Sequence, residues 1–431
     1  MRILVLGTGG REHALCWRLQ RDPEVTLLLA APGNPGIAAL TRCVPVDPLN
    51  PDAVLAVAVQ ERIDLTVVGP EAPLERGLAD LFRQHGRPIV GPSRAGAALE
   101  CSKVFSKHFM AAHDIPTARF AVCDTPTAAL EAVCGASFDV PLVVKADGLA
   151  AGKGVVVAES RAEAEAAVRA AMVDLQFGSA GSRLVVEECL TGPEVSLFAL
   201  CDGMRAIPLS TAQDHKRIFD EDRGPNTGGM GAFAPSPLAT DDLRTFAMHR
   251  VIQPVLEGMR AAGEPYVGFL YVSLMLTPQG PKVIEFNVRF GDPEAQVILP
   301  QLEGSLAAAL YSAATGDLRS DVVREGTQPA VGVVLASRGY PAAAEHGQPI
   351  DGLAAAADVP GALIFHAGTA VAQGRLVTAG GRVLTVVGRG ATFQDAMTTA
   401  YRAVDRIHFA GMQCRRDIGR KAADNGRENA I

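Results

Sequence analysis

A short stretch near residue 285 carries the side chains best suited to chemistry. Residues 282–296 read Lys-Val-Ile-Glu-Phe-Asn-Val-Arg-Phe-Gly-Asp-Pro-Glu-Ala-Gln. Side chains alternate between the faces of a β-strand, so Glu285, Asn287 and Arg289 share one face. The opposite, apolar face would hold Ile284, Phe286, Val288 and Phe290. Oxygen ligands beside a guanidinium suit Mg²⁺, whose shell phosphate oxygens complete, and an anionic substrate. A half-buried strand shows the same alternation, but the acidic turn at 291–294 favours a site.

A glycine-rich loop upstream could hold the phosphates. Residues 141–157 pass from an apolar strand ending at Lys145 through a loop containing Gly152, Lys153 and Gly154 into three valines. A Walker A loop would need Ser or Thr after Gly-Lys and a helix after that. The pattern therefore predicts a β-hairpin flap that closes over phosphates, with Lys145 as a point charge. A plain hairpin with a flexible tip is the alternative.

Acidic residues follow in a third segment. Residues 183–190 and 194–198 predict two strands around a Thr-Gly-Pro turn. Glu187, Glu188 and Glu194 could contact adenine and ribose, or they could be solvated charges at a sheet edge.

The first hundred residues predict parallel βαβ units. Apolar strands at 2–6, 25–30, 63–68 and 88–92 alternate with helical stretches such as 12–19. The turn at 7–10 is not a dinucleotide fingerprint, because Glu12 stands where the third glycine belongs and no acid ends the second strand. A helix N-terminus behind glycines still binds an anion. We interpret this turn as part of a sugar-phosphate pocket.

The remaining elements are predicted from periodicity. Helices are expected at 102–113, 161–172, 240–262 (bent at Pro254), 303–314 and 392–407. Strands are expected at 266–276, 281–290, 331–336, 363–366, 371–379 and 383–388. A polar stretch at 317–328 marks a domain boundary, and the tail after Gly419 is expected to fray. The irregular loop at 213–234 is long enough to predict a functional role.

Composition narrows the class of protein. A chain of 431 residues suggests about three domains. The net charge of −7 argues against a nucleic-acid binder. Eight cysteines without a Cys-x-x-Cys pair argue against structural zinc and disulfides and favour a reducing cytoplasm. We expect no signal peptide and no membrane span.

Taken in order, these motifs resemble the ATP-grasp ligases and, within them, the phosphoribosylamine–glycine ligase family (glycinamide ribonucleotide synthetases) of purine biosynthesis. The resemblance covers essentially the whole chain and rests on residues 7–14, 68–74, 145–155, 187–196, 213–217, 224–231, 284–294 and 366–369. The chain departs from the family pattern at Ser273, Val288 and Ala295, and Phe219 and Arg223 are unusual in their loop.

The resemblance implies an α/β ATP-grasp fold in three parts. These are an N-terminal Rossmann-like (pre-ATP-grasp) domain at 1–101, an ATP-grasp domain at 102–320 with a mobile flap lobe at about 116–187, and a C-terminal α/β domain at 321–431. It also implies a cytoplasmic monomer that joins glycine to 5-phosphoribosylamine with ATP and Mg²⁺ or Mn²⁺, through glycyl phosphate. The expected partners are these small molecules, with no nucleic acid and no membrane.

The resemblance also implies roles for particular residues. Glu285 and Asn287 would hold the metal, and Arg289 and Lys145 would be catalytic. ATP would be bound by Lys145, Gly152, Lys153, Gly154, Glu187, Glu188 and Glu194. The substrates would be bound by Gly9, Gly10, Arg11, Glu12, Glu71, Asp214, Lys216, Arg217, Asn226, Thr227, Gly228, Arg289, Gly291 and Asp292. We do not expect His215 to act as a base.

Two other functions remain open at this point. One is another acyl-phosphate ligase or carboxylase of the same fold, against which residues 214–217 and the N-terminal glycine motif argue. The other is a non-catalytic nucleotide sensor, against which Glu285 and Asn287 argue.

Overall fold

The computed structural model describes residues 1–149 and 154–428, and it begins with a parallel sheet of the order β3-β2-β1-β4-β5. Its strands are β1 (Arg2–Gly7), β2 (Leu27–Pro32), β3 (Arg42–Cys43), β4 (Leu65–Val68) and β5 (Ile89–Val90). The helices of this unit are α1 (Gly10–Leu19), α2 (Pro35–Ala38), α3 (Pro51–Gln60), α4 (Ala72–Glu75), α5 (Leu78–Gln84) and α6 (Arg94–Cys101). The parallel pairing of β1 with β2 and β4 confirms the predicted βαβ units.

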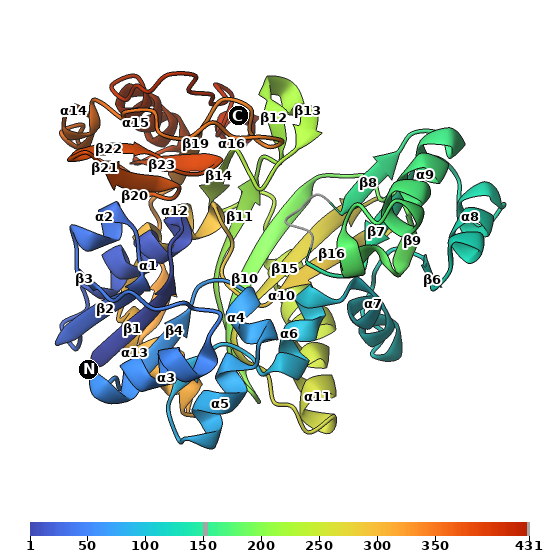
Figure 1. The fold of residues 1–431 in the computed structure, drawn as a ribbon, viewed down its shortest axis with the longest axis horizontal. Coiled ribbons are helices and arrows are strands. Elements are labelled where there is room, and N and C mark those ends of the chain that lie inside the picture. The colour runs from blue at the N-terminus through green and yellow to red at the C-terminus, as the bar shows by residue number, and fades with distance from the viewer. Residues whose placement is uncertain (150–153, 429–431) are drawn as a thin grey trace.

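A small lobe follows and stands apart from the rest of the chain (Figure 1). Helix α7 (Lys103–Ala112) leads into it, and its sheet has the order β6-β9-β7-β8. The elements are β6 (Phe120–Cys123), α8 (Pro126–Cys134), β7 (Leu142–Ala146), β8 (Val155–Ala158), α9 (Arg161–Val168) and β9 (Leu184–Glu188). Strands β7 and β8 pair antiparallel, which confirms the predicted hairpin.

An eight-stranded sheet of the order β16-β15-β10-β11-β14-β19-β23-β20 forms the body. Its strands are β10 (Glu194–Asp202), β11 (Ala206–Asp214), β14 (Gly231–Ala234), β15 (Val267–Thr277), β16 (Gly280–Asn287), β19 (Ala330–Ala336), β20 (Ala362–His366) and β23 (Arg382–Arg389). Because β14 pairs with β19, the C-terminal strands extend the sheet that begins in the ATP-grasp part of the sequence.

Helices and short hairpins complete the body. The helices are α10 (Asp241–Ala247), α11 (Gln253–Ala261), α12 (Glu294–Ile298), α13 (Leu306–Ala314), α14 (Leu353–Ala357), α15 (Phe393–Val404) and α16 (Arg420–Glu428). The hairpins are β12 (Arg217–Phe219) with β13 (Arg223–Asn226), β17 (Leu302–Gly304) with β18 (Val323–Glu325), and β21 (Thr369–Ala372) with β22 (Arg375–Thr378).

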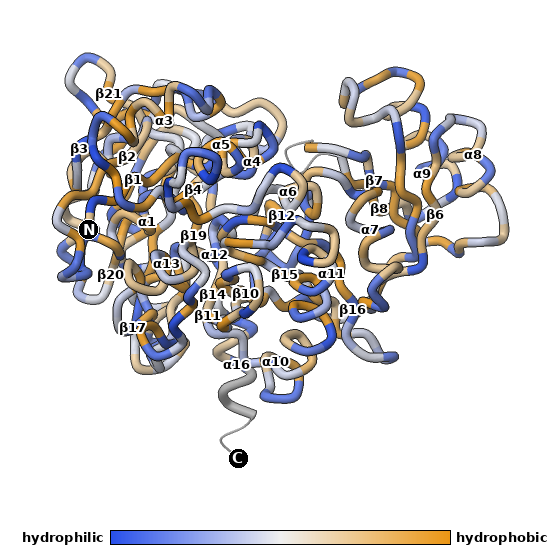
Figure 2. The backbone as a smooth tube through the Cα atoms, turned by 90° about the horizontal axis from the view of Figure 1, so that it is seen from below, coloured by the Kyte–Doolittle hydropathy of each residue, from blue (hydrophilic) through white to orange (hydrophobic). Residues whose placement is uncertain are grey.

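The hydrophobic core divides the molecule differently from the sheets. Residues of β1 and α1 share one core cluster with β10 and α13, so the N-terminal sheet is packed firmly onto the body. The small lobe has a cluster of its own, which includes Leu142, Val144 and Leu184. Hydrophobic residues follow the strands in both parts (Figure 2). The lobe therefore has a hydrophobic core separate from that of the body.

Several predicted elements differ from those observed. The expected helix at 102–113 begins a residue later, where the Ser102 hydroxyl caps it by accepting from the Phe105 N–H at 3.0 Å. The expected helix at 240–262 is interrupted by a π-helical turn at Met248–Ile252, just before Pro254. The expected strand at 371–379 is a hairpin, because Gln373 and Gly374 both adopt positive φ. The expected frayed tail is helical at 420–428.

Within residues 1–149 and 154–428, we find no helix with the length and apolar character needed to cross a bilayer.

Candidate active site

The two predicted metal ligands lie near the end of β16, at the edge of the central sheet. Glu285 lies opposite Ser273 and Asn287 opposite Tyr271. Asn287 is only 7% exposed, and its amide nitrogen has no hydrogen-bond partner among the described residues. The Asn287 side-chain oxygen beside the Glu285 carboxylate is of the type that binds a hard cation, and the unpaired amide nitrogen could donate to a phosphate oxygen. Since the described residues contain no group of three or more His, Cys, Asp or Glu side chains that could hold a metal, phosphate oxygens would have to complete its shell.

The simple alternation predicted for this strand is wrong at Ile284. The β15–β16 register shifts there, so that Ile284 bulges and Val283 takes its place in the core. The strand ends at Asn287, and Phe290 packs in a different core cluster from Phe286. The bulge leaves Glu285 half-buried on the side of the small lobe.

Three lysines pair with two acids, Glu187 from the small lobe and Glu285 from the edge strand of the body. Lys103 Nζ lies 3.1 Å from Glu285 Oε2. Lys107 Nζ and Lys145 Nζ each lie 3.0 Å from Glu187 Oε2. The side chains of Lys107, Lys145 and Glu187 are buried. The sequence analysis predicted helix α7 but missed its two lysines. Their four-residue spacing, which places them on one helix face, was the available signal.

The lysines also set the charge state of this region. Burial alone would raise the pKa of Glu285, but the ammonium groups of Lys103, Lys216 and Lys145 outweigh it and hold that pKa well below its usual range. Burial lowers the pKa of Lys107 to about 8, against the pull of its carboxylate partner. Glu285 is therefore an ionised carboxylate surrounded by ammonium groups, a charge pattern that fits a metal–phosphate complex.

Glu188 and Glu194 have separate protein partners. Glu188 accepts from Arg119 Nε and Lys282 Nζ, both at 2.8 Å. Burial alone would raise the pKa of Glu188, but these hydrogen bonds outweigh burial and lower that pKa to about 2. Glu194 pairs with Lys216 and accepts from the Ser273 hydroxyl at 2.6 Å. Ser273, one of the departures noted in the sequence, thus contacts a residue that is predicted to bind the nucleotide.

Arg289 joins two acids from distant parts of the chain. Its Nη2 lies 2.8 Å from Glu100 Oε1, and its Nε lies 3.1 Å from Glu71 Oε2. Glu100 also accepts from the Val288 N–H at 2.8 Å. The structure therefore brings together Arg289 and Glu71, both predicted to bind substrate, and adds Glu100, which the sequence analysis did not single out.

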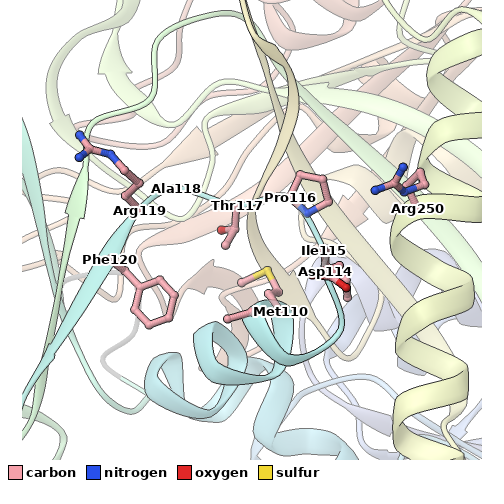
Figure 3. A pocket seen from close by; sticks show the side chains of 10 residues that line it. Met110, Asp114, Ile115, Pro116, Thr117, Ala118, Arg119, Phe120 and Arg250 are labelled. Atoms are coloured by element: carbon pink, nitrogen blue, oxygen red, sulfur yellow. The ribbon is translucent and has the colours of Figure 1, made fainter.

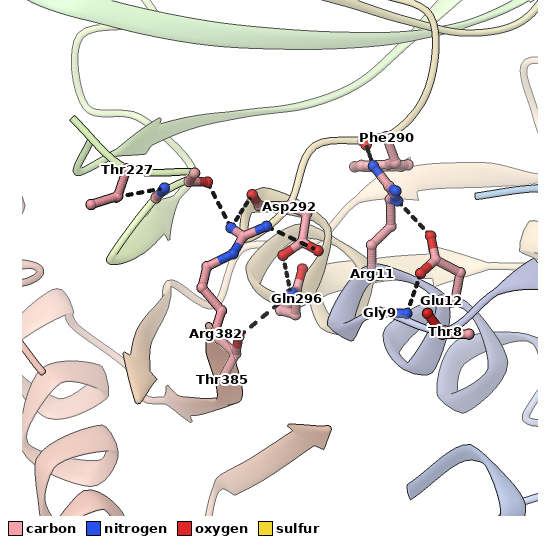
Figure 4. Close-up of polar contacts among 12 residues, drawn as sticks. Thr8, Gly9, Arg11, Glu12, Thr227, Phe290, Asp292, Gln296, Arg382 and Thr385 are labelled. Carbon is pink, nitrogen blue, oxygen red and sulfur yellow. Dashed lines mark hydrogen bonds and ion pairs between the residues drawn. The ribbon is translucent and has the colours of Figure 1, made fainter. Parts of the chain in front are cut away.

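The Gly9 turn already holds a carboxylate. Helix α1 begins at Gly10, and the Gly9 N–H donates to Glu12 Oε2 at 2.6 Å (Figure 4). Arg11 Nε donates to Glu12 Oε1 at 2.6 Å, and Arg11 Nη1 donates to the Phe290 carbonyl at 3.0 Å. Glu12 thus caps its own helix, and a substrate phosphate at this turn would depend on the remaining N–H groups of the first turn.

Asp292 is held by the C-terminal part of the chain. Arg382 Nη1 donates at 2.6 Å to the carbonyls of both Asp292 and Gly228, and Gln296 Nε2 donates to Asp292 Oδ1 at 2.8 Å (Figure 4). The turn that begins at Gly291 and the loop at Gly228, both predicted to bind substrate, are therefore joined by Arg382. No motif in the sequence pointed to this arginine.

The rest of the predicted substrate loop lies around the β12–β13 hairpin. Arg217 pairs with Asn226 across the hairpin, and its guanidinium donates to the Gly224 carbonyl at 2.7 Å. The Thr227 hydroxyl donates to the Lys216 carbonyl at 2.9 Å, which ties the end of the loop to its beginning. The long loop is therefore partly regular. Of the predicted flap residues, Gly152 and Lys153 lie outside the described residues, whereas Gly154 is buried immediately before β8.

Asp214 is an acid whose pKa its surroundings raise strongly. Burial raises its pKa to about 8, with help from Glu194 and Glu294 and against Lys216. The Tyr271 hydroxyl donates to Glu294 Oε1 at 2.9 Å. Asp214 and Glu294 raise each other's electrostatic cost of ionisation, and an additional cation, such as the amino group of an amino acid, would relieve it.

We expect Asp214→Asn to change how stability depends on pH. A raised pKa means that the folded state binds the proton more tightly, so the wild type loses stability as pH rises from about 4 to about 8. The asparagine variant lacks this titration, and its advantage over the wild type should grow across that range. Urea unfolding of the ligand-free protein at several pH values measures this. A constant difference from pH 4 to pH 8 would contradict the raised pKa.

A cavity lies beside the linker from α7 to β6. It measures about 640 Å³, and Thr117, Arg119 and Phe120 line it together with Arg250 from the π-helical turn (Figure 3). None of the predicted site residues lines it. Arg119, however, connects it to Glu188.

The arrangement of a flap lobe over an edge strand that carries the acids, with lysines between them, defines an ATP-grasp enzyme. Models of the phosphoribosylglycinamide synthetase N domain, ATP-grasp (A) domain and C domain match residues 1–100, 101–295 and 330–421. The chain belongs to the phosphoribosylglycinamide synthetase family.

Relatives and solved structures agree with this assignment. The chain is 48% identical to phosphoribosylamine–glycine ligases of Xylella fastidiosa and Mesorhizobium japonicum, over 98% of this chain and 98% of each relative. It matches the crystal structure of the Thermotoga maritima phosphoribosylamine–glycine ligase with a TM-score of 0.82 and 34% identity, over 97% of this chain and 100% of that one. The biotin carboxylase domain of Hydrogenobacter thermophilus 2-oxoglutarate carboxylase, at 16% identity and a TM-score of 0.73, shares the fold over 96% of this chain and 91% of that one.

Proposed function

We propose that this chain is a phosphoribosylamine–glycine ligase of purine biosynthesis. It joins glycine to 5-phosphoribosylamine and converts ATP to ADP and phosphate. The observation that carries this proposal is full-length membership of the family, with 48% identity to curated ligases over nearly the whole chain. The convergence of three lysines on Glu187 and Glu285 supports the ATP-dependent part.

The reaction is mainly one of positioning. A glycine carboxylate oxygen attacks the γ-phosphorus of ATP and ADP leaves; the amine of phosphoribosylamine then attacks the glycyl carbonyl carbon, phosphate leaves and the amine loses a proton. Lys145 and Lys107 are placed to neutralise phosphate oxygens as they gain charge. We propose that Asp214 and Glu294 bind the glycine ammonium and that Arg289 orients an anionic group.

ATP-grasp ligases use ATP with a divalent metal, and we propose Mg²⁺ or Mn²⁺ here, held by Glu285 and Asn287. When bound, the metal would withdraw charge from the transferring phosphate. We further propose that the protein acts as a cytoplasmic monomer. We propose that its domains span residues 1–101, 102–320 and 321–431, with the flap lobe at about 116–187.

Release of ADP tests the proposed function directly. ADP should form at a catalytic rate only when glycine and phosphoribosylamine are both present with Mg·ATP. Turnover that requires bicarbonate or another carboxylate instead of glycine would identify a different ligase of the same fold. Nucleotide binding without turnover under any of these conditions would identify a sensor.

We expect Lys145→Met to weaken the use of ATP more than the use of glycine. Lys145 is buried beside Glu187, and its proposed partner is a phosphate oxygen. The KM for ATP should rise at least about tenfold, since a charge-assisted hydrogen bond contributes about 1.5–3 kcal/mol. Initial rates across ATP and glycine concentrations measure both values. Lys421→Met, which removes an exposed lysine paired with Asp222, provides a matched comparison. An unchanged KM for ATP and an unchanged kcat would exclude Lys145 from the site.

A further inference from the structure

A second cavity, remote from the residues proposed for catalysis, carries an excess of positive charge. It measures about 450 Å³ and is open to solvent between helix α1, residues 300–304 and the ends of strands β20 and β23. Trp17 and Arg21 from the end of α1, and Leu363 and Arg389 from the C-terminal strands, face it. Because α1 packs against β20, the cavity lies where the N-terminal and C-terminal parts of the chain meet.

One of the three arginines in this cavity is fully committed to the protein. Arg18 Nη1 lies 2.5 Å from Asp22 Oδ1, and its other nitrogens donate to the carbonyls of Leu302 and Gly304. Asp22 in turn accepts from the Ala307 N–H at 2.7 Å. This pair is neutral overall and leaves no free carboxylate oxygen for a neighbouring guanidinium.

The other two arginines have no acidic partner among the described residues. Arg21 lies over the Trp17 ring, 3.8 Å from its centroid, and its only side-chain hydrogen bond goes to the Trp17 carbonyl at 2.5 Å. Arg389 forms no ion pair within residues 1–149 and 154–428, and its Nε is buried there without a hydrogen-bond partner. Two arginines therefore line this cavity without a carboxylate of the described residues to neutralise them.

The electrostatics point the same way. Burial lowers the pKa of Arg21, and the neighbouring positive charges of Arg18 and Arg389 lower it further. These like charges stay together in a chain whose net charge is −7, where acids are available to neutralise them. An anion that bridges Arg21 and Arg389 would remove this repulsion.

We propose that this cavity is a binding site for a phosphate group, either free or carried as a monoester by a small molecule. Two guanidinium groups match the charge of a phosphate dianion and can each donate two parallel hydrogen bonds to its oxygens. The volume is that of an ordinary small-molecule site. Trp17, Pro300 and Leu363 give it an apolar wall for the organic part of an ester.

Trp17 makes the test direct, because it is the single tryptophan of the chain. Tryptophan fluorescence and calorimetry of the full chain are followed during titration with inorganic phosphate and, separately, with ribose 5-phosphate, at constant ionic strength set by chloride. We expect a saturable change in fluorescence and a binding heat with at least one of the two. Phosphate alone would indicate a free-anion site, and tighter binding of the ester would indicate a phosphomonoester site.

Two variants decide whether the binding belongs to this cavity. Arg389→Gln should weaken the affinity at least about tenfold, whereas Arg250→Gln, an exposed arginine of the other cavity, should leave it unchanged. Thermal unfolding and ADP release should match the wild type for Arg389→Gln, which shows that the variant is folded. The proposal is overturned if neither probe gives a saturable signal, if chloride alone gives the same signal, or if Arg389→Gln binds as tightly as the wild type.

Discussion

Glu285→Gln should lower kcat by about two to three orders of magnitude at saturating Mg·ATP and leave the fold intact. A metal ion contributes several kcal/mol of transition-state charge stabilisation, and each 1.36 kcal/mol corresponds to a tenfold change in rate. The substitution keeps the shape of the side chain but removes the charge that Lys103, Lys145 and Lys216 now balance. Steady-state ADP release and circular dichroism measure the two effects.

A matched acid on the surface separates the loss of a metal ligand from the loss of one negative charge. Glu303→Gln removes an exposed carboxylate that pairs with Arg324 and should leave turnover unchanged. A titration with Mg²⁺ completes the test, because a weakened metal site should need more metal to reach its reduced rate. If Glu285→Gln turned over normally across the titration, Glu285 would not be a metal ligand.

Arg289→Leu should lower the free energy of unfolding by about 3–5 kcal/mol, in addition to any effect on the reaction. Removing one partner of a buried ion pair leaves an uncompensated charge, which is strongly destabilising. Here the carboxylates of Glu100 and Glu71 would both lose their guanidinium, and the Glu100 side chain is only 6% exposed. Burial already raises the pKa of Glu100, against the pull of Arg289. Urea unfolding measures the change.

A second substitution, at Glu100, tests this explanation. In the double variant Arg289→Leu with Glu100→Gln, no unpaired charge remains at residue 100, so much of the lost stability should return. Arg324→Leu, which breaks an exposed pair with Glu303, should cost less than about 1 kcal/mol. If Arg289→Leu were as mild as Arg324→Leu, the Arg289 cluster would not contribute to stability.

Local sequence determined much of the framework of this protein. The parallel strands of the N-terminal unit, the hairpin of β7 and β8, and the alternation that places Glu285 and Asn287 near the end of β16 follow from periodicity and turn residues, which act over a few neighbours. The glycine and acid motifs were specific enough to indicate the family, which the comparisons confirm.

Tertiary structure decided which of these side chains meet and which charges remain free. Lys107 meets Lys145 at Glu187, and Glu100 meets Arg289, across separations in sequence that no local pattern encodes. The bulge at Ile284 depends on its pairing with β15. The C-terminal strands extend the central sheet through the antiparallel pairing of β19 with β14. Long-range packing fixes such contacts through the shape and burial of whole elements, so they exist only once the chain has folded.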